Sequence, residues 1–336
     1  MDWNTMTSTC WSNSATLRIL GILLLGQLVS FSLALMSITS SLIAQFGVDA
    51  PLTQSLFTYA SLALVYGSIL IYRHQKPLVS WYWYLLLGFA DAQGCYLVIK
   101  AYQYSSITSV TLLDCWIVPW VIILTWIFIG TRYSLWQLAG GTICVLGLSL
   151  VLLSDSVGGG GGGGSNAILG DVLVIVGTVF YAVSNVGEEF CVKKKDRVEV
   201  VSMLGVYGFL VTAVEVCILE RKTLESVKWS TNIVLAFAGY SVSGFMFYSL
   251  APFVLKLSGS TMFNLSLLTA DMWAVIFRVF FYNQKVDWLY FLSFAVVGIG
   301  LVIYSTTEKK SVTTSATEDG KNTEYQILDD ESTSGI

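Results

Sequence analysis

Ten long apolar stretches dominate this chain of 336 residues and limit what it can fold into. As an α-helix, a stretch of about 20 residues spans the roughly 30 Å hydrocarbon core of a bilayer. Lipid offers no partner to an unpaired backbone group, so each stretch should be helical. Only 12% of the residues are charged, against about 25% in soluble domains, which excludes a soluble globular enzyme. The sequence therefore predicts an all-α membrane protein with ten transmembrane helices, near residues 18–44, 52–72, 81–102, 107–129, 134–153, 168–191, 199–219, 231–255, 258–282 and 287–304.

The residue types that metal or acid–base chemistry needs are scarce. The single histidine, His74, lies in the basic stretch 72–76, and the six cysteines stand singly, without the spacing of a zinc site or a disulfide framework. No basic patch interleaved with aromatic residues indicates nucleic acid. We therefore expect a protein that is not an enzyme and has no metal, cofactor, structural disulfide or nucleic-acid partner.

The placement of Lys and Arg predicts the orientation of the chain. The first apolar stretch is too long for the h-region of a cleaved signal peptide and should remain as the first span. If the N-terminus is cytosolic, twelve of the eighteen Lys and Arg residues fall in cytosolic segments. The positive-inside rule then predicts that both termini are cytosolic. We expect a multi-pass protein of an endomembrane or the plasma membrane.

The first five and the last five apolar stretches resemble two copies of one unit. The end of the fifth stretch, 145–154, and the end of the tenth, 296–305, share five of ten residues, and Ile-Leu-Gly opens both the first and the sixth. Asp114 in the fourth stretch is matched by Asp271 in the ninth. Because five spans are an odd number, the second copy must be inverted across the bilayer. Inverted repeats are a transporter architecture, with the solute site near the midplane between the halves.

Composition divides the chain further. Seven consecutive glycines, Gly158–Gly164, are too flexible to hold one conformation and indicate a tether between the two halves. The polar residues from Thr306 onward indicate a disordered tail, in which Tyr325–Leu328 has the form of a sorting signal. The expected organisation is a cytosolic N-terminal segment 1–16, a first five-helix repeat 17–153, a Gly-rich linker 154–167, a second five-helix repeat 168–305 and a disordered cytosolic tail 306–336.

Acidic residues inside the apolar stretches are the strongest signs of a site. An ionised side chain at mid-bilayer costs about 2.5 to 3.5 kcal/mol, so Asp91, Asp114 and Asp271 should face protein or water. Polar residues at helical spacing also share one face of the third, fourth, sixth and ninth stretches. Four such faces turned inward would enclose a hydrated cavity. The residues expected to bind a solute or a coupling ion are Asp114, Asn264, Asp271, Asn185, Glu188, Tyr181 and Lys100.

Some of these residues have a structural alternative. Ser, Thr and Asn within spans often only make hydrogen bonds between helices. Glu188 and Glu189 precede the run Lys193–Lys195 and could be solvated charges at the membrane interface. Lys100 could extend to the lipid headgroups. Small residues predict close helix packing and prolines predict kinks, the candidates being Gly140, Gly141, Gly147, Gly298, Gly300, Pro119 and Pro252.

Longer motifs of the chain resemble a known family. Tyr96–Tyr104 followed by Thr108–Cys115, Leu169–Leu173 followed by Tyr181–Asn185, and Asn264 before Leu268–Asp271 are similar to the F subfamily of solute carrier family 35. The resemblance covers about residues 17–306. It implies the drug/metabolite transporter fold, with ten helices in two inverted five-helix repeats, and a solute site built largely from the fourth and ninth spans.

The resemblance implies a secondary-active transporter that moves a small polar organic solute by alternating access. Other branches of the family carry nucleotide sugars, but their Gly-Ala-Leu-Asn-Lys-type motif in the ninth span is absent here. Two alternatives stay open: a membrane regulator or receptor that keeps the fold without transporting, and a nucleotide sugar as the substrate. The expected partners are the solute and the lipid bilayer. A homodimer with a second copy of the chain is a further candidate assembly.

Overall fold

The computed structural model describes residues 3–74, 80–101, 113–157, 167–270 and 295–307, together with positions 104, 110, 272–273, 276–277 and 292. This part of the chain is helical throughout, without a strand, as the sequence predicts. Asp271, the glycines 158–164 and the segment Tyr325–Leu328 lie outside the described residues.

The described part contains nine labelled α-helices, two of which are extended by π-helical turns, and one further apolar helix near its end. The first half of the chain holds α1 (Trp3–Gln45), α2 (Pro51–Tyr72), α3 (Trp81–Ala101), α5 (Ile117–Leu124) with the turn Thr125–Ile129, and α6 (Leu135–Val157). The second holds α7 (Ala167–Lys194), α8 (Arg197–Glu215) with the turn Val216–Glu220, α9 (Arg221–Ser226), α10 (Thr231–Leu267) and the apolar helix Ala295–Thr307.

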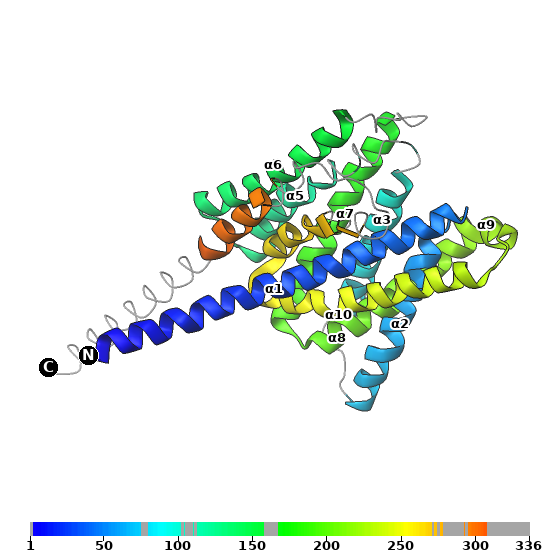
Figure 1. Cartoon of the computed structure of the whole chain (residues 1–336). Coiled ribbons are helices and arrows are strands. Elements are labelled where there is room, and N and C mark those ends of the chain that lie inside the picture. Colours follow the sequence, from blue (N-terminus) through cyan, green and yellow to red (C-terminus); the bar gives the residue numbers. More distant parts are fainter. Residues whose placement is uncertain are drawn as a thin grey trace.

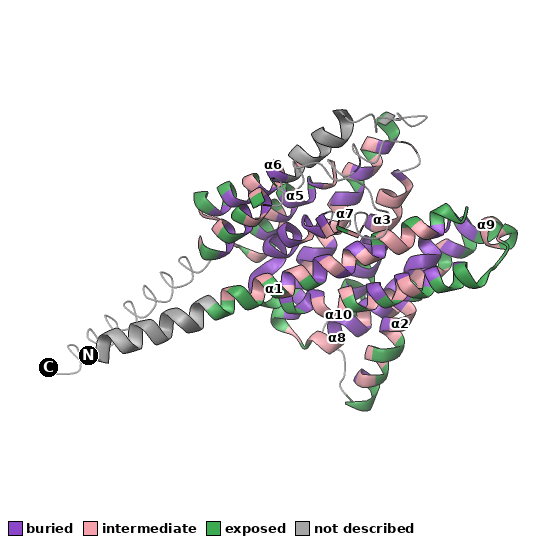
Figure 2. Cartoon of the chain, viewed as in Figure 1, coloured by how far each residue is buried: buried purple, intermediate pink, exposed green. Residues whose placement is uncertain are grey.

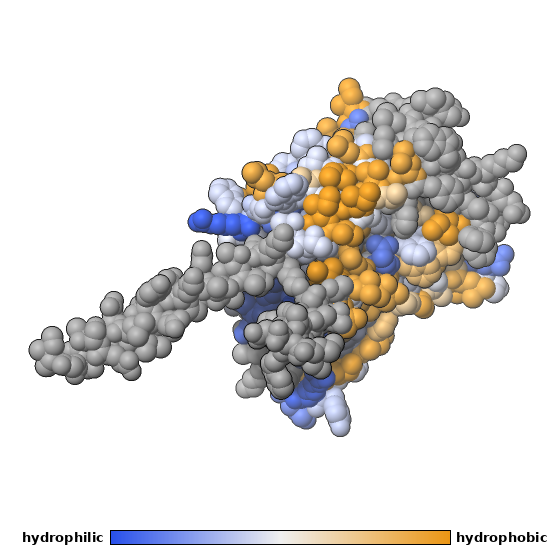
Figure 3. Space-filling model, turned by 60° about the vertical axis from the view of Figure 1, so that its left-hand side comes forward, coloured by the Kyte–Doolittle hydropathy of each residue, from blue (hydrophilic) through white to orange (hydrophobic). Residues whose placement is uncertain are grey.

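Five helical segments of the described chain are long and apolar enough to cross a membrane. They are Leu17–Gln45, Pro51–Tyr72, Ile168–Lys194, Arg197–Ser226 and Thr231–Leu267. Large apolar side chains such as Leu64, Leu210 and Ile218 point outward on these helices, and Figure 3 shows apolar side chains gathered in a broad patch on one face. An exterior of this kind suits lipid and not water. The molecule is a multi-pass helical membrane protein.

One helix boundary differs from that expected, and one break agrees with expectation. α1 begins at Trp3, so residues that the polar composition assigned to a separate N-terminal segment continue the first helix. The label α10 covers the expected eighth span and the start of the ninth, and its 37 residues would measure about 55 Å if straight. The chain breaks instead at Gly259, where φ is 81° and ψ is 172°. Pro252 lies inside the helix, and the non-helical angles fall at Gly259.

The helices pair across the two halves of the sequence. α1 packs along α10, α2 along α8, and α3 against α7 and α8; Figure 1 shows α1 running beside α10. Figure 2 shows the buried residues where these helices meet. The positions that bring polar side chains of the two halves together are therefore the inner faces of α2, α3, α7 and α10.

Small residues allow the closest of these contacts. A methyl group at Gly140 would lie 2.9 Å from the Gly300 carbonyl oxygen, and one at Gly147 would lie 2.9 Å from Val297, so close packing is confirmed at these positions. Among the described residues, a methyl at Gly298 would meet nothing within 4 Å. The expectation that Gly298 serves close packing is wrong, because this residue faces away from the helix that Gly300 contacts.

Candidate functional site

A buried carboxylate joins four helices at the centre of the described structure. Asp91 of α3 is 4% exposed. Its Oδ2 atom accepts hydrogen bonds of 2.5 Å from the hydroxyls of Tyr59 on α2 and Tyr248 on α10. Its Oδ1 atom accepts one of 3.3 Å from Ser184 on α7. We call these four residues the Asp91 cluster. It links the first half of the chain to the second at mid-helix positions.

Glycines position the aromatic rings around this carboxylate. The ring of Tyr59 packs against Gly208 of α8, where an added methyl group would lie 2.8 Å from the ring. The ring of Tyr181 on α7 packs in the same way against Gly94 of α3, also at 2.8 Å. Such distances are below ordinary contact, so only glycine admits the rings here. The two glycines therefore fix where the tyrosines stand.

A second polar group lies one turn along α3 from Asp91. The thiol of Cys95 is 3.2 Å from the hydroxyl of Ser55 on α2, and residues four apart on a helix share a face. Tyr181 and Tyr240 are further electrostatic neighbours of this thiol. The Asp91 cluster thus continues along α3 into a surface of hydroxyl, thiol and aromatic groups.

Glu188 is the second carboxylate in this layer. It follows Ser184 by one turn on α7, is 4% exposed and has Asp91 as its electrostatic neighbour. Among the described residues its Oε1 atom has no hydrogen-bond partner. A buried carboxylate oxygen left unpaired is costly. Glu188 is therefore the acid in the described layer whose hydrogen bonding is left incomplete by the surrounding described residues.

Two of the predicted residues form a direct pair. The side-chain amide of Asn185 on α7 donates to the Oδ1 atom of Asn264 at 2.9 Å, and the amide of Asn264 donates to the Ser260 carbonyl at 2.7 Å. Both side chains are buried. Because Asn185 follows Ser184 directly, this pair adjoins the Asp91 cluster and extends the polar layer to the part of α10 beyond its break.

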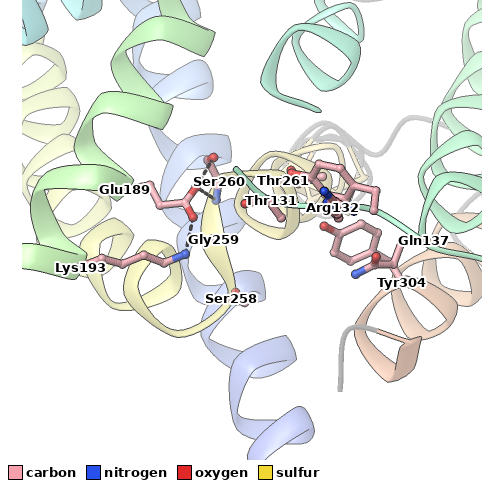
Figure 4. Close-up of a pocket in the computed structure, with 11 residues that line it drawn as sticks. Thr131, Arg132, Gln137, Glu189, Lys193, Ser258, Gly259, Ser260, Thr261 and Tyr304 are labelled. Atoms are coloured by element: carbon pink, nitrogen blue, oxygen red, sulfur yellow. Dashed lines mark hydrogen bonds and ion pairs between the residues drawn. The ribbon is translucent and has the colours of Figure 1, made fainter. Parts of the chain in front are cut away.

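Glu189 has a different environment from its neighbour Glu188. Its Oε2 atom accepts hydrogen bonds from the backbone N–H of Ser260, at 2.7 Å, and from the Ser260 hydroxyl. Its Oε1 atom pairs with Lys193 at 2.5 Å. Ser260 is the first residue after the break at Gly259, so Glu189 caps a helix N-terminus. Figure 4 shows these contacts.

A small cavity opens beside this cap. Its volume is about 210 Å³, and Figure 4 shows Glu189 and Lys193 on one side, with Arg132 and Gln137 on the other. The hydroxyl of Tyr133 bonds that of Thr261 at 2.6 Å across the two halves. The cavity is thus a polar opening at the end of α7 and not part of the Asp91 cluster.

Lys100 lies apart from this layer, and Asp114 lies just before α5. Lys100 Nζ pairs with Asp49 Oδ2 at 3.7 Å, and nine helical residues from Asp91 correspond to about 13 Å. Asp114 precedes α5 and is half-buried, and its neighbour Leu113 packs against Val174 of α7. The structure brings Tyr181, Asn185, Glu188 and Asn264 into one layer and leaves Lys100 outside it. Cys115, which follows Asp114, lies in one apolar cluster with Tyr181.

Sequence reasoning did not select Tyr59, Tyr248 or Ser184. Asp91 was expected to face protein or water, and it faces protein, but it was not among the candidate ligands. A tyrosine in an apolar stretch gives no sign of its partner, because aromatic residues also anchor spans at the membrane interface. The available signal was the mid-helix position of Asp91, which demands polar partners from other helices.

Comparison with known proteins supplies a family. A family model described as "SLC35F: Solute carrier family 35" matches residues 15–306. Solute carrier family 35 member F2 of Mus musculus is 35% identical over 305 residues, covering 88% of this chain and 81% of the mouse protein. The protein of the same name from Xenopus tropicalis is 35% identical, covering 84% and 75%.

Two further matches are more distant. An uncharacterised solute carrier family 35 member of Schizosaccharomyces pombe is 33% identical, covering 76% of this chain and 52% of the yeast protein. A crystal structure of another protein superposes with a TM-score of 0.69 at 17% identity, covering 89% of this chain and 98% of the other. That likeness shows a shared fold.

Proposed function

The chain belongs to solute carrier family 35, and on that premise we propose that it is a secondary-active transporter of a small polar organic solute, working by alternating access. Membership implies a carrier of solutes or nucleotide sugars. The observation that carries the proposal beyond membership is the Asp91 cluster, a mid-membrane carboxylate held by both halves of the chain. Ionisable residues at such positions mark solute and ion pathways.

We propose further that the chain forms ten transmembrane helices in two inverted five-helix repeats. A twofold axis relating the repeats would exchange α1 with α7, α2 with α8, and α3 with the first part of α10. The pairing of α1 with α10 then becomes that of α7 with α3, and the pairing of α2 with α8 maps onto itself, in agreement with the observed contacts. The close approach of Gly140 and Gly300, from the fifth and tenth spans, also maps onto itself.

The roles of the side chains follow from where the halves meet. Solute sites of inverted-repeat transporters lie near the midplane between the repeats. Asp91, Glu188 and the Asn185–Asn264 pair occupy the contact of α3 with α7 and α10, so they would contact the solute or a coupling ion. Tyr181 would line the same space. Asp114 and Asp271 stay candidates for contact with the solute or a coupling ion, and Lys100 would act along the route rather than in this layer.

The orientation with both termini cytosolic has support from one ion pair. Arg73, at the end of α2, lies 3.1 Å from Asp196, which precedes α8. Lys193 and Lys194 end the neighbouring helix α7. These basic residues therefore gather at one end of the bundle, as the positive-inside rule requires of a cytosolic face. Protease protection of terminal epitope tags in sealed vesicles would test this.

Transport is tested with the purified protein in two steps. A thermal-shift screen of a metabolite library identifies a stabilising solute, and uptake of that solute into proteoliposomes follows. We expect Asp91→Asn to reduce uptake at least tenfold, with Asp114→Asn and Asp271→Asn reducing it as well. Glu225→Gln, which removes an exposed carboxylate from an (i, i+4) pair with Arg221, should transport like the parent. Normal uptake by the Asp variants would show that these assignments are wrong.

A further inference from the structure

The polar layer contains two buried carboxyl groups with no basic partner among the described residues. Asp91 and Glu188 are both 4% exposed and are electrostatic neighbours. Lys256 is a described basic residue inside an apolar segment, and its side chain is exposed. None of the described Lys and Arg residues forms an ion pair with Asp91 or Glu188.

The two carboxylates differ in how far the protein completes them. Asp91 accepts three hydrogen bonds from hydroxyl groups. Glu188 Oε1 accepts none from the described residues, although it is buried. A buried acceptor without a donor is the position that a ligand donor would fill. A cationic hydrogen-bond donor next to Glu188 and Asp91 would complete the hydrogen bonding of Glu188 and compensate the charge of either carboxylate.

Aromatic rings favour an organic cation over a metal ion. The rings of Tyr59 and Tyr248 lie with centroids 5.8 Å apart beside Asp91, and Tyr181 and Tyr240 lie beside Cys95, one turn along α3. Aromatic faces attract organic ammonium groups. Hard metal cations need several oxygen ligands, and the described residues contain no group of three or more His, Cys, Asp or Glu side chains that could hold one.

We propose that the transported solute carries a protonated amine or a similar organic cationic group, and that this group binds between Asp91 and Glu188 among the four tyrosines. Asp91 and Glu188 would neutralise its charge, and Glu188 would accept its N–H. This inference rests on the proposed transport function and names the class of solute. It requires a route along which hydrated cations reach the layer more readily than anions do.

Cys95 reports on this requirement without knowledge of the solute. It lies one turn from Asp91 and is partly accessible. We would prepare a variant that keeps Cys95 alone, with alanine at positions 10, 115, 144, 191 and 217. The thiol would be labelled with cationic 2-(trimethylammonium)ethyl methanethiosulfonate or anionic 2-sulfonatoethyl methanethiosulfonate. Each rate is divided by the rate of the same reagent with 2-mercaptoethanol.

We expect the normalised rate of the cationic reagent to exceed that of the anionic one by about tenfold or more, because clefts of one charge concentrate counter-ions by such factors. Asp91→Asn and Glu188→Gln should each reduce this preference severalfold. Glu225→Gln, far from the layer and exposed, should leave it unchanged. Size-exclusion profiles and melting temperatures of the variants show that they remain folded.

The outcomes separate the two proposals. Labelling at equal normalised rates would overturn the cation inference, while the hydrated route that transport needs would stand. Labelling by neither reagent would overturn both. Protection provides a second arm: benzylammonium should slow labelling of Cys95 and the neutral isostere benzyl alcohol should not. No protection by benzylammonium, or equal protection by both compounds, would contradict an organic-cation site.

Discussion

The molecule buries acidic side chains in two regions, and it uses them differently. At helix ends, Glu189 meets the N-terminus that begins at Ser260, and Glu220 meets the N-terminus of α2, where it accepts from the backbone N–H groups of Leu52 and Thr53 at 2.7 and 2.9 Å. At mid-helix positions, Asp91 accepts only side-chain hydroxyls and Glu188 Oε1 has no described donor.

The difference follows from where a helix offers unpaired donors. The first turn leaves backbone N–H groups free and carries partial positive charge, so a carboxylate there is stabilised by the fold itself. The middle of a helix has no free backbone donor. A carboxylate at that depth depends on other side chains or on a ligand. Glu188 and Glu189 are adjacent in the sequence, but Glu189 meets the free backbone donor of a helix N-terminus and Glu188 does not.

The largest effect in this comparison is expected for Glu189→Ala. The substitution leaves the buried Ser260 N–H and hydroxyl without their acceptor, while Lys193 is partly exposed and can be solvated. Each charge-assisted hydrogen bond contributes about 1.5 to 3 kcal/mol, and two are lost. We expect the free energy of unfolding in detergent to fall by about 4 kcal/mol. The exposed control Glu225→Ala should melt like the parent. A parent-like melting temperature for Glu189→Ala would show that the cap does not stabilise the fold.

Glu220→Gln tests the second helix-end carboxylate with its shape retained. Glu220 also accepts from the Thr53 hydroxyl at 2.6 Å. In the glutamine variant an NH2 group replaces one carboxylate oxygen and faces N–H or O–H donors. Charge-assisted hydrogen bonds contribute about 1.5 to 3 kcal/mol. We expect a loss of about 3 kcal/mol in chemical unfolding monitored by tryptophan fluorescence. A loss below about 1 kcal/mol would remove Glu220 from the class of structural acids.

Gly259→Ala tests the break that gives Glu189 its helix end. At φ 81° an added methyl would also lie 2.9 Å from Glu189 Oε1, and such backbone conformations cost other residues about 1 to 3 kcal/mol. We expect a loss of about 2 kcal/mol by thermal unfolding. The matched control is Gly298→Ala, where the methyl meets open space and stability should be unchanged or slightly raised. Equal behaviour of the two variants would contradict the strained break.

The smallest effect on stability is expected for Glu188→Gln. Removing a buried charge that the described protein does not complete should change the free energy of unfolding by less than about 1 kcal/mol, in either direction. Uptake of the identified solute should nevertheless fall. A loss of stability above about 2 kcal/mol, as at Glu189, would show that Glu188 stabilises the fold as Glu189 does. That result would contradict the distinction between the two residues.

Part of the candidate layer could be recognised from the sequence. Tyr181, Asn185 and Glu188 repeat at helical spacing in an apolar stretch, and that local pattern places them on one face of α7. Their partners could not be recognised in the same way. The groups that bond Asp91 lie 32, 93 and 157 residues away along the chain, and no local periodicity reports contacts between helices so far apart.

The broad architecture follows from the hydropathy of individual sequence segments. Each apolar stretch is long enough to require a helix in lipid whatever its neighbours do, so the sequence alone determined a helical, multi-pass membrane protein and the approximate bounds of its helices. Tertiary packing decided the rest: that α10 breaks at Gly259 and not at Pro252, that Gly300 and not Gly298 meets a neighbouring helix, and that Glu189 is capped against Ser260 while Glu188 is not. Those choices depend on which helix faces meet, and facing surfaces come from segments that the sequence keeps far apart.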